Sequence, residues 1–361
     1  MNKFKKIGLS ALCGSLASIS AASAGSIDVT GSALATWTGL GGQVTGNPIG
    51  MATGLTFTGN GELDGGQTFS VAIAHTNKDA YSSANITLNT NSAGTFKLSS
   101  AEGGAGIGGY DDNMPRAWEE VWDTGITTRA NFQKGVASTT NLSWKSPKFV
   151  GTTFQIAYTP ENDGSSNVKK GTSGGSDTFG SGWDMVLDTG TADGSINLFI
   201  GGSRTELAKI QADRDLSGDH EEAVVGLQFK FGPVALGGQV SGERLRTRAL
   251  NTAEYYGNSS WGIAFNVNDS LSVSYSEARH LMTKTHKANN PGGAQSSNGT
   301  ATRNDNEYTP KSWMRGDSIQ VAYTIGGVGL KYARTSYDNT AFTFDAKIPR
   351  EAQIVAVSLA F

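Results

Sequence analysis

The sequence predicts an all-β fold, a 16-stranded antiparallel up-and-down transmembrane β-barrel. Apolar and polar residues alternate with a period of two in run after run, which is typical of strands with two different faces. The connections between these runs alternate between short turns and long loops, as they do in membrane-spanning barrels. The chain also stays strand-like to its last residue, with Val355, Val357, Leu359 and Phe361 on one face. A barrel requires this, because its last strand must pair with its first.

Residues 1–24 are predicted to be a cleaved signal peptide, and residues 25–361 to form the barrel domain. Three lysines lie within the first six residues and precede a short apolar run that ends in small residues at Ala24, which is the pattern of a secretory leader. Cleavage would remove Cys13, the single cysteine, so the mature chain could form no disulfide bond. It would also take the formal net charge from -3 to -6, which makes nucleic acid an unsuitable partner.

The strands follow one another along the chain as short alternating runs separated by glycine-rich turns. In order, the expected strands are 27–37, 55–63, 68–76, 84–90, 95–100, 141–146, 153–159, 182–189, 195–202, 222–231, 234–242, 260–267, 271–278, 317–325, 328–337 and 351–361. Glycine, with 48 residues, supplies the positive φ that tight hairpins need. Nowhere do about 18 apolar residues run together, which excludes a membrane-spanning helix.

The lengths of the connections give the barrel two different ends. Short turns are expected at 64–66, 91–94, 147–151, 190–193, 232–233, 268–270 and 326–327, and long loops at 39–50, 101–138, 160–180, 204–220, 243–257, 279–314 and 338–349. The short connection 77–82 is the one exception, because the alternation calls for a long loop there. Short connections at one end and long ones at the other are typical of a membrane barrel.

The two faces of the strands differ in chemistry. One face carries Phe57, Val71, Ile73, Phe154, Ile156, Leu198, Ile200, Leu227, Phe229, Ile263, Phe265, Val321, Tyr323, Leu330 and Leu359. The other carries Thr56, Thr58, Ser70, Thr87, Lys97, Ser143, Lys145, Gln155, Asn197, Gln228, Lys230, Ser272, Ser274, Gln320 and Lys331. A soluble β-sandwich alternates in the same way. The even number of strands and the aromatic residues near strand ends favour the barrel.

The terminal strand and the segment GGYDDNMPRAWEEVWD (108–123) make the chain resemble the general porins of Gram-negative outer membranes, especially those of the alphaproteobacterial type. The resemblance covers the layout of residues 25–361. It implies a water-filled channel in the outer membrane, reached through the periplasm, for passive diffusion of small hydrophilic solutes and ions. It also implies a homotrimer in contact with outer-membrane lipid and lipopolysaccharide, and recognition of Phe361 by the barrel-insertion machinery.

The resemblance also suggests where subunits meet. Porins form trimers through the strands that flank the closure of the barrel. The outward positions Gly31, Ala33 and Ala35 of the first strand are small. Small residues favour close packing of protein against protein within a membrane.

In porins the third long loop folds into the barrel and narrows it, and residues 101–136 hold that position in this chain. The loop residues expected at the constriction are the acids Asp111, Asp112, Glu119, Glu120 and Asp123. The basic residues expected on the pore wall are Lys97, Lys145, Lys230 and Lys331. Opposed charges across a narrow lumen sort solutes by charge. A structural interpretation is open for each acid, which could cap a short helix over PRAWEEVWD or pair with Arg116.

The charges favour a weak preference for cations. General porins commonly carry clustered arginines opposite the loop, whereas this chain shows only scattered lysines on its inward faces. Further acids are expected on the inner faces of the strands, namely Asp28, Glu62, Asp184, Asp188 and Glu222. With a net acidic mature chain, the lumen should attract cations.

Other chemistry has weaker support in the sequence. GAGIGG (104–109) lacks the βαβ context of a dinucleotide site, and GTSGG (171–175) lacks the strand-to-helix turn of a nucleophile. The four histidines show no metal-ligand spacing. No cofactor is expected, although the carboxylates of DRDLSGDHEE (213–222) could hold calcium at the mouth of the barrel.

Three other functions stay open beside the general channel. A substrate-selective channel should show a ladder of aromatic residues or of charges of one sign along the lumen. A secreted soluble β-sandwich could bind carbohydrate and would extract without detergent. An outer-membrane enzyme would need a positioned nucleophile and base, and no strand presents one.

Overall fold

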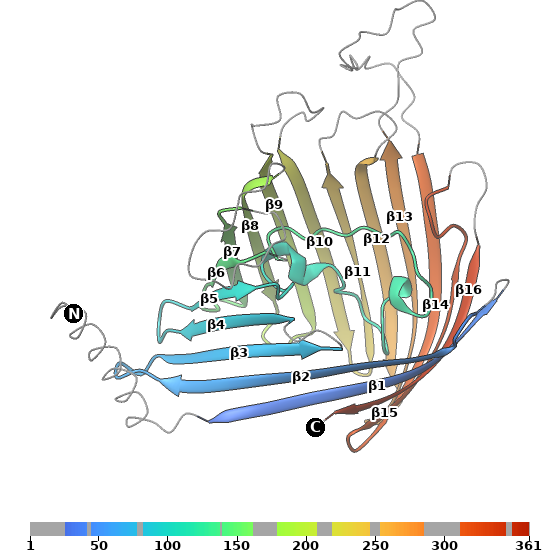
Figure 1. The fold of residues 1–361 in the computed structure, drawn as a ribbon, viewed down its shortest axis with the longest axis horizontal. Helices are drawn as coiled ribbons and strands as arrows, with labels where there is room; N and C mark the ends of the chain where they lie inside the picture. Colours follow the sequence, from blue (N-terminus) through green and yellow to red (C-terminus); the bar gives the residue numbers. More distant parts are fainter. Residues whose placement is uncertain are drawn as a thin grey trace, which may run out of the picture.

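Sixteen strands form one closed antiparallel barrel in the computed structural model (Figure 1). The structure describes residues 26–41, 45–77, 82–137, 139–161, 179–207, 219–245, 253–284, 311–343 and 349–360. The strands are β1 (Ile27–Gly41), β2 (Ile49–Glu62), β3 (Thr68–Thr76), β4 (Ser83–Asn89), β5 (Thr95–Ser100), β6 (Asn141–Lys145), β7 (Thr152–Thr159), β8 (Phe179–Gly190), β9 (Ile196–Leu207), β10 (His220–Phe231), β11 (Val234–Arg244), β12 (Ala253–Asn266), β13 (Leu271–Lys284), β14 (Lys311–Ile325), β15 (Val328–Tyr337) and β16 (Arg350–Ala360). Each strand pairs with its neighbours in sequence, so the predicted up-and-down topology is confirmed.

The expected strands match the observed ones in number and order, but several extend further into the long loops. The strand expected at 260–267 begins at Ala253, and the one expected at 317–325 begins at Lys311. These extensions contain few aliphatic residues and several charged or small ones, so they lack the sustained apolar alternation that marks a strand in the sequence. Hydrogen bonds to the neighbouring strand hold them instead, as in the pairing of Tyr256 with Met282.

The barrel closes between its first and last strands. Ala33 lies opposite Leu359, Ala35 opposite Val357, and Trp37 opposite Val355. The terminal run is therefore a fully paired strand up to Ala360. Phe361 and the predicted leader 1–24 lie outside the described residues.

The outer surface of the barrel is apolar, as the alternation predicts. Large side chains exposed there include Phe57, Val71, Ile73, Leu198, Ile200, Leu227, Ile263, Phe265, Tyr323, Leu330 and Leu359. Trp183 and Trp313 are exposed toward the long-loop ends of their strands, and Phe231 toward a short-turn end. Aromatic side chains at both edges of an apolar band are typical of a membrane barrel.

The inner surface is less polar than the alternation predicts. Val186, Phe199 and Val224 point inward and are buried together with Ile107. Residues 101–137 lie against these inner side chains and cover them, so apolar residues replace polar ones where the loop packs. Among the described residues, no helix is long and apolar enough to cross a bilayer. The short helix considered over 115–123 appears only as a 3₁₀ turn at Val121–Asp123.

A charge on the outer face should destabilise the barrel far more than the same charge on the inner face. Replacing Ile263, which is exposed on β12, with lysine should lower the free energy of unfolding by roughly 2–4 kcal/mol, because the ammonium group would face hydrocarbon. Equilibrium unfolding by denaturant in phospholipid vesicles measures this cost. The matched control is Ser272→Lys on the inner face of β13, near the short-turn end of the same hairpin, and an equal loss in both variants would contradict the assignment of faces.

Candidate functional site

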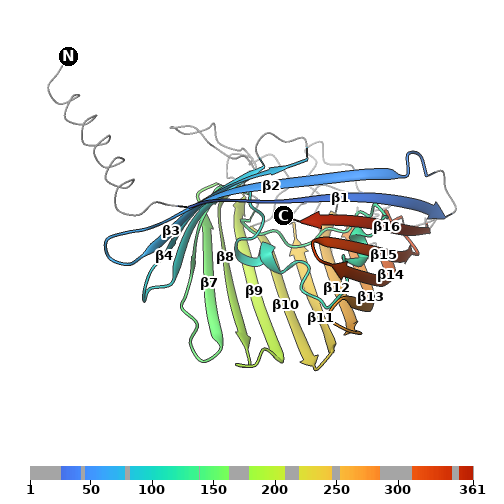
Figure 2. The same cartoon turned by 90° about the horizontal axis from the view of Figure 1, so that it is seen from below.

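The long segment 101–137 runs through the interior of the barrel. Figures 1 and 2 show it crossing inside the ring of strands from β5 to β6. Its backbone is hydrogen bonded to inward side chains of β8, β10, β13 and β14. The strands that flank it, β5 and β6, are only 6 and 5 residues long. Because these two strands are short, the loop enters the barrel well below the ends of the longer strands. The candidate site consists of this loop and the part of the wall that faces it.

Asp184 on β8 binds both the first part of the loop, near Ile107, and its last part, near Val136. Its side chain is fully buried, and its carboxylate accepts hydrogen bonds from the backbone N–H groups of Ile107, at 3.1 Å, and Val136, at 3.2 Å. Gly106 and Gly135 precede these donors, and both have positive φ. A Cβ at either glycine would overlap the Asp184 carboxylate. The loop thus approaches the wall closely only because both positions are glycine.

Glu222 on β10 provides a second attachment beside the first. Its two carboxylate oxygens accept hydrogen bonds from the backbone N–H groups of Lys134, at 3.1 Å, and Gly135, at 2.6 Å. Asp184 and Glu222 were expected to add negative charge to the lumen. Both point inward as predicted, but they are buried beneath the loop and not exposed to the lumen. A buried carboxylate needs such donors, and the loop supplies them.

The middle of the loop is held against the opposite part of the wall. Gln320 on β14 accepts hydrogen bonds from the backbone N–H groups of Trp118 and Glu119, both at 3.0 Å. Ser274 on β13 accepts one from Ala117 at 2.9 Å. Beyond this point an apolar cluster joins loop residues Met114, Val121 and Ile126 to strand residues Ala278, Met282, Met314, Tyr337 and Ala352, and to Phe342 of the loop between β15 and β16. The loop is therefore anchored at both its ends and its centre.

Four of the five predicted constriction acids fall into two groups that share Glu120, and Asp111 belongs to neither. Asp112 and Glu120 both form ion pairs with Arg116, the first at 3.0 Å, so the structural interpretation holds for these two. Glu119, Glu120 and Asp123 place one oxygen each within 4.8 Å of one another. The structure thus brings three of the acids together and uses two in ion pairs.

Burial keeps several of these carboxyl groups protonated to higher pH. It raises the pKa of Asp111 to about 6, with the neighbouring Asp112 adding to the effect. Burial and a hydrogen bond with the Glu119 carboxyl raise the pKa of Glu120, and the ion pair with Arg116 opposes this rise. Burial also raises the pKa of Asp123, and the charge of Glu119 contributes. The charge of the loop therefore depends on pH near neutrality.

The four predicted wall lysines do not form one basic surface. Lys97 forms an ion pair with Glu102 at 2.6 Å, and Lys331 lies 5.7 Å from the ring centre of Trp118. Lys145 and Lys97 line one cavity of about 430 Å³, which they share with Asp188. Lys230 is exposed near the short-turn end of β10, beside the turn at 232–233. Two of the lysines thus touch the loop and one lies at the rim.

Two of the remaining inward acids, Asp188 and Asp28, take part in local hydrogen bonds, whereas Glu62 is exposed at the end of β2. Asp188 accepts one from the Tyr110 hydroxyl, at 3.0 Å, and one from the Asn197 amide, at 2.7 Å. Asp28 accepts one from the Asn60 amide at 3.0 Å. These two acids are partly or fully exposed, so they can still contribute charge to the lumen.

The small residues of the first strand face outward, as predicted. Gly31, Ala33 and Ala35 alternate with inward residues such as Leu40, which packs against the apolar cluster of the loop. Met51 lies opposite Ala35 on β2 and is 80% exposed. An apolar surface with small residues on β1 therefore extends from β1 to β2.

The segment considered for calcium divides between the two faces of β10. Residues 213–218 lie outside the described residues. Asp219 pairs with Arg204, and Glu221 lies opposite Arg244. His220 and Glu222 point to the other side, into the barrel, where Glu243 of β11 joins them. The spacing in sequence missed this group, because its third member comes from the next strand.

Comparison with known proteins gives one family and many similar structures. The pattern of the Gram-negative porin family matches residues 8–297. No curated protein sequence matches the chain significantly. An anion-selective porin from Comamonas acidovorans has a TM-score of 0.62 and 13% identity, covering 93% of this chain and 100% of its own. Salmonella typhi OmpF in complex with daunomycin has a TM-score of 0.59 and 13% identity, covering 93% and 97%. The trimer form of Vibrio cholerae OmpT has a TM-score of 0.55 and 9% identity, covering 93% and 99%.

Removing the Asp184 carboxylate should release the loop from the wall. In Asp184→Ala the N–H groups of Ile107 and Val136 lose their acceptor, at a cost of about 1–3 kcal/mol for each buried group. Amide hydrogen exchange of the peptides that cover 105–110 and 134–138, measured by mass spectrometry in detergent, should become faster. Asp193→Ala in an exposed short turn is the control and should leave these peptides unchanged. Equal protection in Asp184→Ala and the native protein would contradict the anchoring role.

Proposed function

The chain belongs to the Gram-negative porin family, and from this premise we propose that it is a general, weakly cation-preferring porin. It is an outer-membrane protein that forms a channel for diffusion. One observation carries the general character of the pore: a closed ring of sixteen strands, apolar outside, with polar side chains facing the lumen. A barrel of this size is too wide for wall side chains to fill, so water occupies the interior beside the loop.

The solutes of this channel are small hydrophilic molecules and ions. Lumen-facing groups with different chemistry are interspersed, such as Lys97, Asp188, Gln155 and Lys145 around one cavity. A substrate-selective channel would instead show a ladder of one kind of group, and the described inward positions favour the general pore over this alternative. The soluble sandwich is excluded by the closed barrel, which has one continuous sheet rather than two packed sheets. The family and fold are those of channels rather than enzymes.

The preference for cations rests on the balance of charge around the loop. Glu119 and Asp123 are acids of the loop that appear in no ion pair among the described residues, whereas Lys97 is neutralised by Glu102. The structurally similar porin from Comamonas acidovorans is anion-selective, so the fold alone does not set the sign of selectivity. The side chains of this chain's own loop and wall must therefore decide it.

The assembly we propose is a homotrimer in lipid and lipopolysaccharide. The outward surface of Gly31, Ala33, Ala35 and Met51 supports it, as does the trimeric form of the similar Vibrio cholerae protein. Export would remove residues 1–24, and Phe361 would be read by the barrel-insertion machinery. Gel mobility before and after heating reports the trimer, and N-terminal sequencing reports the cleavage.

Reconstitution in a planar bilayer tests the channel directly. The purified protein should give stepwise conductance that increases in proportion to salt concentration, as expected for an aqueous pore. Polyethylene glycols of increasing size should reduce the conductance until they become too large to enter. A bilayer that stays electrically silent would contradict the proposal. A conductance that saturates at low concentration of one class of solute would contradict the general character of the pore.

The preference for cations should increase with pH. Carboxyl groups with raised pKa values are uncharged below those values, so raising the pH through about 6 ionises Asp111 and makes the lumen more negative. The reversal potential in a salt gradient, measured between pH 5 and pH 9, reports this change. The double variant Glu119→Gln with Glu120→Gln should show a weaker cation preference at high pH. Asp193→Asn, in an exposed turn, is the control, and anion preference in the native protein at pH 8 would contradict the proposal.

A further inference from the structure

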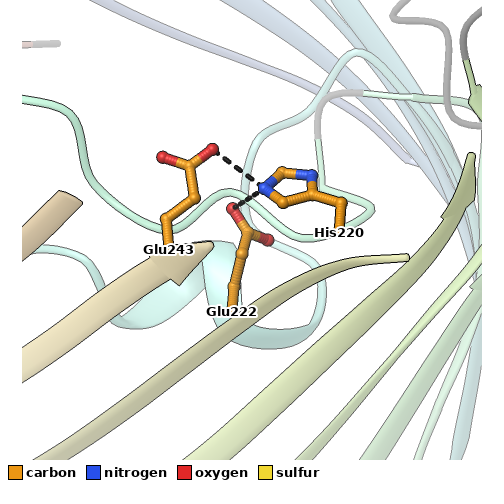
Figure 3. A group of neighbouring side chains, drawn as sticks. All are labelled: His220, Glu222 and Glu243. Atoms are coloured by element: carbon orange, nitrogen blue, oxygen red, sulfur yellow. Dashed lines mark hydrogen bonds and ion pairs between the residues drawn. The ribbon is translucent and has the colours of Figure 1, made fainter. Parts of the chain in front are cut away.

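Three side chains with metal-binding atoms meet on the inner face of two neighbouring strands (Figure 3). His220 and Glu222 are two residues apart on β10, so they point to the same side. The register of β10 with β11 places Glu222 directly opposite Glu243. Glu222 and Glu243 are buried, and His220 is half-buried. Two strands of the rigid wall therefore hold all three groups.

The distances between the donor atoms are close to those around a first-row transition metal ion. Nε2 of His220 lies 3.0 Å from Oε1 of Glu243 and 3.9 Å from Oε1 of Glu222. One atom of each side chain lies within 4.8 Å of the others. Zinc bonds of about 2.0–2.2 Å in a tetrahedral arrangement separate neighbouring ligand atoms by about 3.3 Å. A small movement of Glu222 would thus complete three corners of a tetrahedron.

The charge of the group favours a cation with two positive charges. Carboxylates placed directly opposite each other on paired strands repel, and burial strengthens the repulsion. Among the described residues, His220 is the ion-pair partner of both Glu222 and Glu243, and neither pairs with a lysine or arginine. A divalent ion beside a neutral imidazole would balance both carboxylates.

The remaining carboxylate oxygens are held by the interior loop. Glu243 accepts a hydrogen bond from the Asn131 amide through Oε2, which leaves Oε1 facing His220. Glu222 accepts from Gly135 through Oε2, while its Oε1 faces His220 and also accepts from Lys134. The ring of Phe179 lies 6.3 Å from the imidazole. Such outer contacts orient metal ligands and strengthen binding.

We propose that His220, Glu222 and Glu243 bind a divalent transition-metal ion, with Zn²⁺ as the representative. Calcium and magnesium prefer sites built only of oxygen ligands, so the imidazole selects against them. Three protein ligands leave a fourth position for water from the lumen. The bound ion cross-links β10 and β11 beneath the last part of the loop. Because Glu222 and Glu243 accept hydrogen bonds from Asn131, Lys134 and Gly135, fixing these carboxylates also holds the loop residues more firmly to the wall.

Calorimetric titration of the tag-free protein in detergent with ZnCl₂ tests the proposal. One Zn²⁺ should bind per chain, and His220→Gln and Glu243→Gln should each lower the affinity by roughly tenfold or more. Glu221→Gln is the matched control, because Glu221 is a neighbouring acid on the outer face of the same strand. Equal affinity in His220→Gln and the native protein, or no binding to the native protein, would overturn the proposal. Binding is measured without any channel recording, so its failure is separate from failure of the proposed pore.

Two measurements on the native protein keep the test decisive if a variant fails to fold. Co²⁺ in place of Zn²⁺ should give a visible absorption spectrum stronger than that of hydrated Co²⁺, because a site with three protein ligands lacks the octahedral symmetry of the hydrated ion. A spectrum identical to that of hydrated Co²⁺ would overturn the proposal. Excess Ca²⁺ should leave bound Zn²⁺ in place, whereas displacement would show a simple acidic site instead. Zn²⁺ should also slow amide exchange in residues 131–136, and unchanged exchange would refute the coupling to the loop.

Discussion

A strand exposed to hydrocarbon must find hydrogen-bond partners for every backbone N–H and C=O group within the protein. In this chain the pairing of β1 with β16 meets that requirement, because it joins the two edges that an open sheet would leave. The closed ring then fixes which face of each strand points outward. The alternation of apolar and polar residues, the aromatic side chains near both strand ends and the paired C-terminal strand all follow from closure.

Closure at this width creates an interior that the wall cannot fill, and the loop occupies much of it. Buried carboxylates of the wall make this placement stable. Asp184 and Glu222 each receive backbone N–H groups from the loop, so the loop satisfies the acids and the acids satisfy the loop. Apolar inward residues such as Phe199 and Met314 are buried where the loop packs. The loop and the wall residues that it covers are therefore closely packed, and the channel is the part of the interior that they leave open.

The charged residues of the interior thus serve two purposes. Asp184, Glu222 and Arg116 hold structure together, whereas Asp28 and Asp188 remain accessible. Glu222 and Glu243 also hold the loop, since Glu222 accepts from it through both oxygens and Glu243 through one, and both face the imidazole of His220 through Oε1.

The sequence by itself determined the fold class, the number and order of strands and the face of most residues, because a period of two is a local property that each strand carries. It also placed the small residues of β1 outside and the long loop in third position. Only the tertiary structure decided which acids are buried and which are paired, as at Asp184 and Glu120. It also extended the starts of β12 and β14 to Ala253 and Lys311 and brought Glu243 to His220. These features depend on strand register and on the path of the loop, and contacts between residues distant in the chain set both.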